Sequence, residues 1–149
     1  MEHSTFVMIK PDAMARDLDQ EIKNFFIRQG LTIKREKVLK VNKTLILEHY
    51  EEVIKRIGTG EFKKAVINEF YNQKVIILEL TTKEQDIVPK VRELIGATDP
   101  AMAKRNTIRG VHGLDSLSQA RAENRMLRNL VHASDSNENA AKELKLWFK

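Results

Sequence analysis

A histidine between a short apolar stretch and a group of helix-starting residues is the part of the sequence best suited to chemistry. His132 follows Leu130 and Val131, and residues 134–136 (Ser-Asp-Ser) favour the start of a helix. We therefore expect His132 at a bend between a short strand and the last helix. Backbone N–H groups at such a bend bind anions, and an imidazole that is largely neutral at pH 7 can attack phosphorus. This pattern favours phosphoryl transfer with His132 as the nucleophile, although the bend alone could equally hold a metal, a general base or a core histidine.

Phosphoryl transfer also needs groups that orient the nucleophile. Glu143 lies eleven residues after His132, three turns into the expected last helix. Its carboxylate can reach back to the imidazole if the strand folds over the helix. Ser134 is nearer and could bond either a phosphate oxygen or that carboxylate.

The phosphate oxygens need cations and hydroxyl groups around them. An arginine binds phosphate through two parallel hydrogen bonds, whereas a lysine acts as a point charge. Asn129 could bond a ribose hydroxyl and Phe62 could stack on a base, but Phe62 and Tyr50 also fit an ordinary helix core. Each charged residue, taken alone, is equally typical of a solvated surface, so only a shared location would make a site. The candidate phosphate ligands are Lys10, Arg92, Thr98 and Arg109.

The elements that must position these residues follow from hydrophobic periodicity. Apolar runs predict strands at residues 5–9, 31–41, 74–80 and 129–132. Residues 105–110 are expected to form a polar, irregular loop. Apolar residues at helical spacing predict helices at 14–29, with Asp12 as a possible cap, and at 43–57, 61–72, 86–95, 117–128 and from Asp135 or Ser136 onward.

Without its extra helices, this order is βαββαβ. It predicts an α+β sandwich of ferredoxin-like type, in which helices cover one face of an antiparallel sheet. A chain of 149 residues is long enough to bury one core, and no repeat or linker divides it. We therefore expect a single domain over residues 1–149.

Composition excludes several classes of protein. Hydrophobic residues make up 42% and charged residues 32% of the chain, which is typical of a globular protein, and no apolar run is long enough to span a membrane. The absence of cysteine excludes disulfides and thiolate metal sites. The N-terminus lacks a signal-peptide pattern, so a cytoplasmic location is expected. The net charge of +5 favours anionic partners, or reflects a solvated surface, and no compact basic run points to nucleic acid.

Three other histidines could compete with His132. Residues 111–116 (Val-His-Gly-Leu-Asp-Ser) resemble 131–136, but His112 follows an arginine rather than an asparagine and lacks the serine two residues later. We therefore expect His112 to be a loop residue. His3 is near the terminus, and His49 is expected at a polar position of a helix.

With these residues in this order, the chain resembles a known family, the nucleoside diphosphate kinases, from Thr5 to Phe148. The most specific part is the pattern Asn129-x-x-His132 followed by residues 133–136, which is similar to the active-site signature of the family. The other matches occur in the family order, at residues 6–12, Glu48-His49-Tyr50, Arg92-x-x-x-Gly96-x-Thr98-x-Pro100, Thr107-Ile108-Arg109-Gly110 and Leu146-Trp147-Phe148.

The resemblance implies a ping-pong reaction in which a nucleoside triphosphate phosphorylates His132 and a nucleoside diphosphate then takes the phosphoryl group. Mg²⁺ would be held mainly by the nucleotide phosphates, with no metal ligand expected directly from the protein. Ser134 and Glu143 would support the histidine, and Phe62 would stack on the base with Val66 beside it. By position, the phosphate and ribose ligands implied are Lys10, Tyr50, Arg92, Thr98, Arg109 and Asn129.

The sequence also departs from the family pattern. Arg105-Asn106 stands where Pro-Gly is usual, and the stretches between Arg109 and His132 and between Tyr50 and Phe62 are longer than usual. The resemblance implies a homo-oligomer, for which a hexamer is favoured over a tetramer, although the C-terminal extension of many hexameric members is missing after Phe148.

Two rival hypotheses are a non-catalytic nucleotide- or nucleic-acid-binding module of ferredoxin-like fold and an inactive regulatory relative. The first predicts aromatic side chains exposed on a strand face, and Phe6 is the only aromatic residue in the expected strands. The second is disfavoured by the complete set of matched residues.

Overall fold

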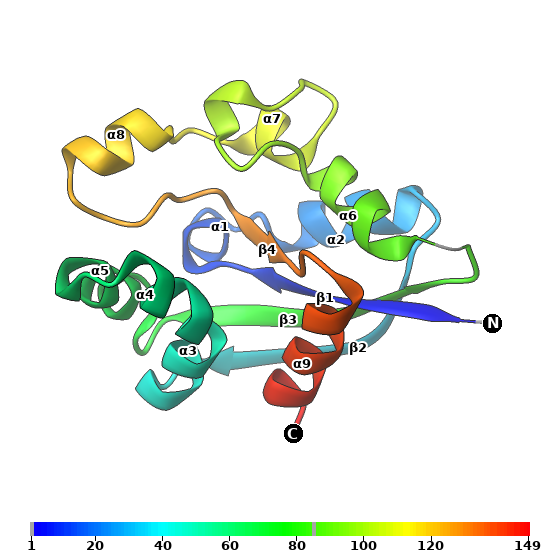
Figure 1. The fold of residues 1–149 in the computed structure, drawn as a ribbon. Helices are drawn as coiled ribbons and strands as arrows, with labels where there is room; N and C mark the ends of the chain where they lie inside the picture. Colours follow the sequence, from blue (N-terminus) through cyan, green and yellow to red (C-terminus); the bar gives the residue numbers. More distant parts are fainter. Residues whose placement is uncertain (1, 85) are drawn as a thin grey trace.

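A four-stranded antiparallel sheet forms the centre of the molecule. The structure is a computed structural model that describes residues 2–84 and 86–149. The strands lie in the order β2-β3-β1-β4 (Figure 1), which confirms the predicted ferredoxin-like sheet. Their bounds are β1 (His3–Ile9), β2 (Thr32–Lys40), β3 (Lys74–Thr82) and β4 (Val131–Ala133).

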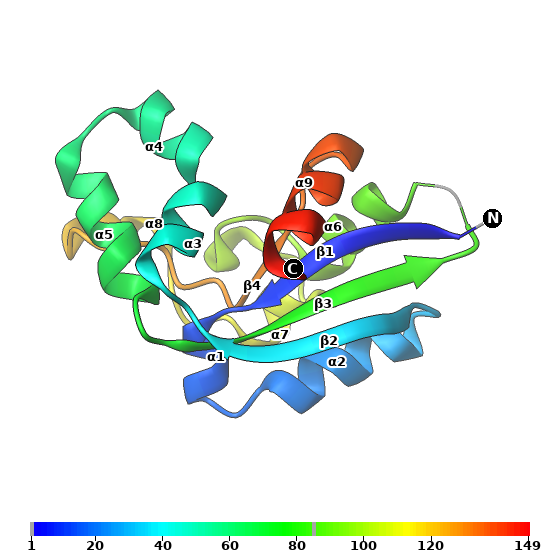
Figure 2. The same ribbon diagram turned by 90° about the horizontal axis from the view of Figure 1, so that it is seen from below.

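Helices cover both faces of the sheet, so the prediction that they cover one face is wrong (Figure 2). The reason is that β1 is apolar at consecutive positions, so both of its faces must be buried. Val7 and Ile9 pack with helices α2 (Asp19–Arg28) and α6 (Ile87–Ile95). Phe6 and Met8 point to the opposite face, where they pack with α3 (Lys43–His49), α5 (Gly60–Phe70) and α9 (Asn137–Trp147).

The strand that carries His132 is short and lies at the edge of the sheet. β4 pairs only with β1, with Met8 opposite His132 and Ile9 opposite Val131. Lys10, directly after β1, donates its backbone N–H to the carbonyl of Leu130 over 2.9 Å. The end of β1 therefore fixes the position of both the histidine and the residues just before it.

Two of the predicted helices are each divided in two. The helix predicted over 14–29 is α1 (Pro11–Ala15) followed by α2, because Asp17 adopts a left-handed conformation with φ of 56°. Asp12 does not cap a helix but lies inside α1 and accepts a hydrogen bond from the backbone N–H of Leu130. The helix predicted over 43–57 is α3 followed by α4 (Glu51–Ile57), with the junction at Tyr50.

The segment before β4 also differs from the prediction. Residues 105–110 were expected to be irregular, but Ile108–His112 form helix α7, because the Thr107 hydroxyl accepts from the N–H of Gly110 and caps the helix start. A 3₁₀ turn, η1 (Pro100–Met102), precedes it. Helix α8 (Leu117–Ala122) is shorter than the predicted 117–128, and residues 123–128 continue without helical structure towards β4.

The other predicted helices are confirmed with small changes of bounds. Thr59 caps α5 and Ser136 caps α9 through hydrogen bonds from the N–H groups of Phe62 and Asn139. Ala140 and Trp147 of α9 are buried, as its periodicity predicts. Across the described ranges, no helix combines the length and the apolar character that a membrane crossing requires.

Candidate active site

A cavity of about 670 Å³ opens between the end of β1, the edge strand β4 and helix α6. Most of the side chains predicted to act together line it, although they come from distant parts of the chain. The fold therefore gives these residues the shared location that spacing alone did not. The predicted residues lining the cavity are Lys10, Tyr50, Arg92, Thr98, Arg109, Asn129 and His132.

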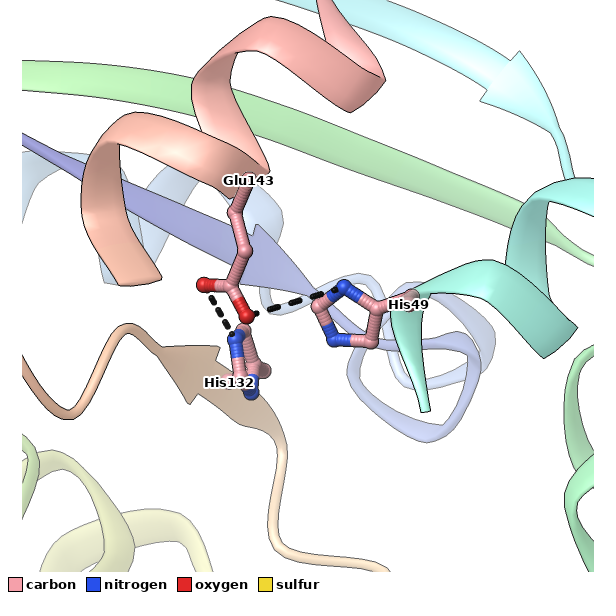
Figure 3. A group of neighbouring side chains, drawn as sticks. All are labelled: His49, His132 and Glu143. Carbon is pink, nitrogen blue, oxygen red and sulfur yellow. Dashed lines mark hydrogen bonds and ion pairs between the residues drawn. The ribbon is translucent and has the colours of Figure 1, made fainter. Parts of the chain in front are cut away.

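His132 is oriented by a carboxylate on the last helix. Its Nε2 lies 3.0 Å from Oε1 of Glu143. Because a carboxylate only accepts hydrogen bonds, Nε2 carries the proton and Nδ1 keeps its lone pair. Figure 3 shows the second ring nitrogen on the side of the imidazole that faces away from Glu143. His132 therefore presents an unprotonated nitrogen whose direction α9 sets through Glu143.

Glu143 is held in turn by Ser134, whose buried hydroxyl donates to the same oxygen. Burial acts to raise the pKa of Glu143, but the hydrogen bond and charge of His132 and the hydroxyl of Ser134 outweigh it, so this pKa lies below its ordinary value. The carboxylate is thus ionised near neutral pH. An ionised partner stabilises any positive charge that develops on the imidazole.

His49 lies against His132, so its expected place at a polar helix position is wrong. The two ring centroids are 4.5 Å apart with an interplanar angle of 78°, and the His49 side chain is 1% exposed. Trp147 donates its indole N–H to Nδ1 of His49 over 3.0 Å. Burial is the main cause that lowers the pKa of His49 to about 3, so His49 stays neutral beside His132.

Arg109 lies at the cavity with its guanidinium fixed by three backbone carbonyls, those of Gly96, Asn129 and Val131, at 3.0, 3.1 and 2.7 Å. The helix that carries it packs closely, since a Cβ on Gly110 would collide with the carbonyl oxygen of Lys104. Burial and the nearby charge of Arg92 lower the pKa of Arg109 to about 10. Two guanidinium groups close together favour an anion between or beside them.

Lys10 is the second fixed cation. It is 4% exposed, and its ammonium donates to Oδ1 of Asn129 at 2.9 Å and to the carbonyl of Leu127 at 3.2 Å. Burial lowers the pKa of Lys10 to about 8, with Asp12 opposing and Arg109 adding to this shift. A phosphate that enters the cavity would stabilise the charged form of this partly desolvated ammonium, because its negative charge replaces the solvation lost on burial.

The remaining cavity ligands are less constrained. Asn129 is buried and donates to the carbonyl of Thr98 over 3.0 Å, so it joins Lys10 to the turn that carries Thr98. Arg92 is exposed at the mouth of the cavity and lies 3.5 Å from the carbonyl of Asp135. Burial raises the pKa of Tyr50, so its phenol remains a neutral hydrogen-bond donor.

Phe62 and Val66, the two expected base contacts, do not line this cavity. Both lie on α5, one turn apart, where Val66 is fully buried and Phe62 packs against the same core at partial exposure. The structure therefore brings together the residues expected to bind phosphate and leaves Phe62 outside this cavity, on α5. Their contacts with a base stay predictions.

Several lining residues were missed by the sequence analysis. Met126 and Leu127 line the cavity just before Asn129, and Met102, Lys104 and Glu93 line its opposite side. Met126 and Leu127 could have been predicted from the sequence, because they stand three and two residues before Asn129 and residues next to a site residue tend to line the same cavity. His112 does not line the cavity, but it was expected in a loop and is instead the last residue of α7; its backbone carbonyl accepts a hydrogen bond from Arg16.

Within residues 2–84 and 86–149, one group of three potential metal ligands was found, formed by His49, His132 and Glu143. It offers two imidazole nitrogens and one carboxylate, whereas Mg²⁺ prefers oxygen ligands and retains several waters. Nδ1 of His49 also already accepts from Trp147. These groups therefore suit a hydrogen-bonded nucleophile, and a Mg²⁺ ion would find better ligands in nucleotide phosphates.

Phe6 does not support the rival hypothesis of a nucleic-acid-binding sheet. That hypothesis requires aromatic rings exposed on a strand face, whereas Phe6 is fully buried and stacks on Trp147 with ring centroids 5.9 Å apart. A ferredoxin-like sheet that presents an imidazole, oriented by a carboxylate, to a cavity lined by cations defines instead a phosphotransferase of the nucleotide-binding type.

The chain belongs to the nucleoside diphosphate kinase family, because the family model described as nucleoside diphosphate kinase matches residues 3–149. A nucleoside diphosphate kinase of Pyrococcus horikoshii is 39% identical over 145 residues, covering 97% of this chain and 84% of the relative. The corresponding protein of Methanocaldococcus jannaschii is 34% identical over 149 residues, covering 100% of this chain and 95% of the relative.

Solved structures agree with this assignment. The nucleoside-diphosphate kinase of Borrelia burgdorferi, described as a transition-state mimic with bound vanadate and ADP, superposes with a TM-score of 0.91 at 29% identity, over 99% of this chain and 88% of that one. An NDP kinase from Pyrobaculum aerophilum gives a TM-score of 0.86 at 30% identity, over 100% and 97% of the two chains.

Proposed function

We propose that this protein transfers the γ-phosphate of a nucleoside triphosphate to a nucleoside diphosphate through a phosphohistidine on His132, with residues 1–149 acting as one domain. The observation that carries the proposal is the hydrogen bond between Nε2 of His132 and Glu143, which leaves Nδ1 as the nucleophilic nitrogen beside a cavity lined by cations. A neutral, oriented imidazole is what attack on phosphorus requires.

In the first half-reaction the lone pair of Nδ1 forms a bond to the γ-phosphorus, and the bond between that phosphorus and the β–γ bridging oxygen breaks. The nucleoside diphosphate leaves with the electrons of that bond. The proton stays on Nε2, where Glu143 balances the charge on the phosphorylated ring. The second half-reaction reverses these steps with another diphosphate as acceptor, which gives ping-pong kinetics.

The cations have separate tasks in this proposal. Lys10 and Arg109 are fixed by protein groups and neutralise the phosphate oxygens, and exposed Arg92 adds a mobile charge at the mouth. Tyr50 and Thr98 donate hydroxyl hydrogen bonds to phosphate, Asn129 meets a ribose hydroxyl, and Phe62 stacks on the base with Val66 behind it. Stacking reads no base edge, so broad base tolerance is expected.

Mg²⁺ is the proposed cofactor, held mainly by the nucleotide phosphates. Bound there, Mg²⁺ would supply positive charge to the phosphate oxygens. The chain's own contribution is to hold the phosphates with Lys10, Arg109 and Thr98, next to the imidazole.

We further propose a homo-oligomer, with a hexamer favoured over a tetramer, and a cytoplasmic location. Apolar residues lie exposed in η1, in α7 and just after α7, where Met102, Val111 and Leu114 are 75%, 58% and 83% exposed. Contact with other subunits would cover this surface.

The test of the chemistry is a two-step label transfer. Incubation with γ-labelled ATP and Mg²⁺ should place acid-labile, base-stable label on the protein, and addition of a nucleoside diphosphate should release it as labelled triphosphate. Label that is stable to acid, or that a diphosphate does not remove, would contradict a phosphohistidine intermediate.

A further inference from the structure

The unusually long stretch before β4 is organised around one partly buried carboxylate. Asp115 accepts both terminal nitrogens of Arg125, at 2.7 and 3.0 Å, and also the backbone N–H of Arg128 at 2.8 Å. The side chains of Asp115 and Arg125 are 9% and 17% exposed. A bidentate pair with so little exposure resists solvent screening much more than a surface ion pair does.

Arg128 connects this stretch to helix α5. Its Nε lies 3.2 Å from Oε2 and 3.4 Å from Oε1 of Glu69, whose side chain is 9% exposed. Glu69 belongs to α5, the helix that carries Phe62 and Val66. We use the name "brace" for the four residues Glu69, Asp115, Arg125 and Arg128. In Figure 1 the chain leaves α8, passes between α8 and α5, and continues to β4.

Polar contacts are important here because packing is incomplete. A second cavity, of about 620 Å³, lies between this stretch and helices α1 and α5, and all four residues of the brace line it. Met126 packs against the core, but the side chains that face this cavity from the stretch include Asp115, Arg125 and Arg128. The position of the stretch on this side therefore depends largely on the hydrogen bonds and ion pairs of the brace.

Residues 126, 127 and 129, which lie between or next to members of the brace, contact the nucleotide cavity. Met126 and Leu127 lie between Arg125 and Arg128, and both line the first cavity. The ammonium of Lys10 donates hydrogen bonds to the carbonyl of Leu127 and to the side chain of Asn129. Nε of Arg109 donates a hydrogen bond to the carbonyl of Asn129. A displacement of this short stretch would move the acceptors of both fixed cations at once.

We propose that the brace is a positioning device, in which Asp115 and Arg125 hold residues 126–129 at a fixed distance from α5 and thereby set the affinity of the site for nucleotides. The inference rests on the proposed function, since it assigns nucleotide binding to the first cavity. It predicts an effect on binding rather than on the chemical step, because none of the four side chains lies at His132.

The most direct test is Arg125→Lys, which keeps both charges of the pair but removes the bidentate hydrogen bonding to Asp115. We expect KM for the diphosphate and the dissociation constant of ADP to rise about tenfold, which corresponds to ~1.4 kcal/mol. We expect kcat to stay within about twofold of its original value. We also expect the alkaline limb of kcat/KM to move to higher pH, because solvent that enters around Lys10 relieves the burial that lowers its pKa to about 8.

Arg121→Lys is the matched control, because it makes the same change at an exposed position of α8 in the same stretch. It should leave KM, ADP affinity and the pH profile unchanged. An unchanged KM and ADP affinity in Arg125→Lys, with the variant folded by circular dichroism, would overturn the proposal. A fall in kcat with an unchanged KM would overturn it too.

Asp115→Asn provides a second variant if Arg125→Lys does not fold. It keeps an acceptor for the N–H of Arg128 but loses the charged pair, and it should also raise the ADP dissociation constant. Failure of the proposed function is distinguishable, because it would show as absence of the acid-labile phosphoenzyme in the unmodified protein, whatever the variants do to ADP binding.

Discussion

The two sides of the nucleotide cavity are built on different principles. On one side, which we call the catalytic wall, β4 and α9 hold His132, Ser134 and Glu143 through short contacts within one stretch of chain. The other region, which we call the entrance, comprises residues 126–129 at the cavity and helix α5 beside them, and an ion pair between Arg128 and Glu69 joins the two next to a second cavity. The catalytic wall is thus fixed by strand pairing and core packing, and the entrance by polar contacts that can change. This division predicts that changes in the wall affect kcat and changes in the entrance affect KM.

The largest effect is expected for the nucleophile in the catalytic wall. His132→Ala should abolish the acid-labile phosphoenzyme and reduce turnover to background, because no other group can form the intermediate. His112→Ala is the matched control, since the sequence around it resembles that around His132 while its side chain lies outside the cavity. Labelling that persisted in His132→Ala and disappeared in His112→Ala would reverse the assignment.

Loss of the orienting carboxylate should be the next largest effect. Glu143→Ala leaves the imidazole of His132 free to rotate and removes the charge that stabilises its phosphorylated form. We expect kcat to fall about 10²-fold with KM little changed. Single-turnover phosphorylation rates at saturating ATP would measure this directly. Glu138→Ala, at an 81% exposed side chain of the same helix, should be neutral, and an equal loss there would indicate damage to α9 rather than loss of orientation.

The pH dependence tests the cation that joins the two sides. The pKa of Lys10 is lowered to about 8 by burial, and in the proposed mechanism the charged ammonium is the form that binds phosphate. As pH rises through about 8 the ammonium is lost, so kcat/KM should fall, approaching about tenfold per pH unit. In Lys10→Arg the fall should move to higher pH, because a guanidinium stays charged. A flat profile up to pH 10 would show that Lys10 does not bind the phosphate.

The smallest effect is expected at the base-binding end of the entrance. Phe62→Ala should raise KM about fivefold or more, because stacking contributes roughly 1–3 kcal/mol per base. Steady-state kinetics with two different diphosphates would show whether the loss is the same for each base, as stacking predicts. Ile57→Ala, at a 44% exposed side chain in adjacent α4, is the comparison. A drop in kcat without a change in KM would place Phe62 with the catalytic wall instead.

The sequence predicted the catalytic wall better than the entrance, for a physical reason. His132, Ser134 and Glu143 lie within twelve consecutive positions, where strand and helix periodicity settle their geometry. The fold class followed from the same periodicity. The consecutive apolar residues of β1 already require burial of both faces, and the error lay in assigning all the helices to one face of the sheet.

The errors cluster where an unusual backbone or a distant contact decides the structure. Asp17 divides a predicted helix because it adopts a left-handed conformation. Glycine is the usual residue in that conformation, and since no glycine stands there the sequence did not indicate the break. His49 was assigned to a polar face because its partner, Trp147, lies 98 positions away. The pairing of Asp115 with Arg125 and the tie from Arg128 to Glu69 likewise depend on how the chain turns after α8.

The hydrogen bond from Lys10 to Asn129 joins residues 119 positions apart, and it has a consequence for folding. The cation comes from the first strand and its acceptor from just before the last, so the binding site exists only when both ends of the domain are in place. A nucleotide bound there links the two ends, and it stabilises the folded state by RT ln(1 + [L]/Kd). The thermal stability of the protein should therefore follow the nucleotide concentration around it.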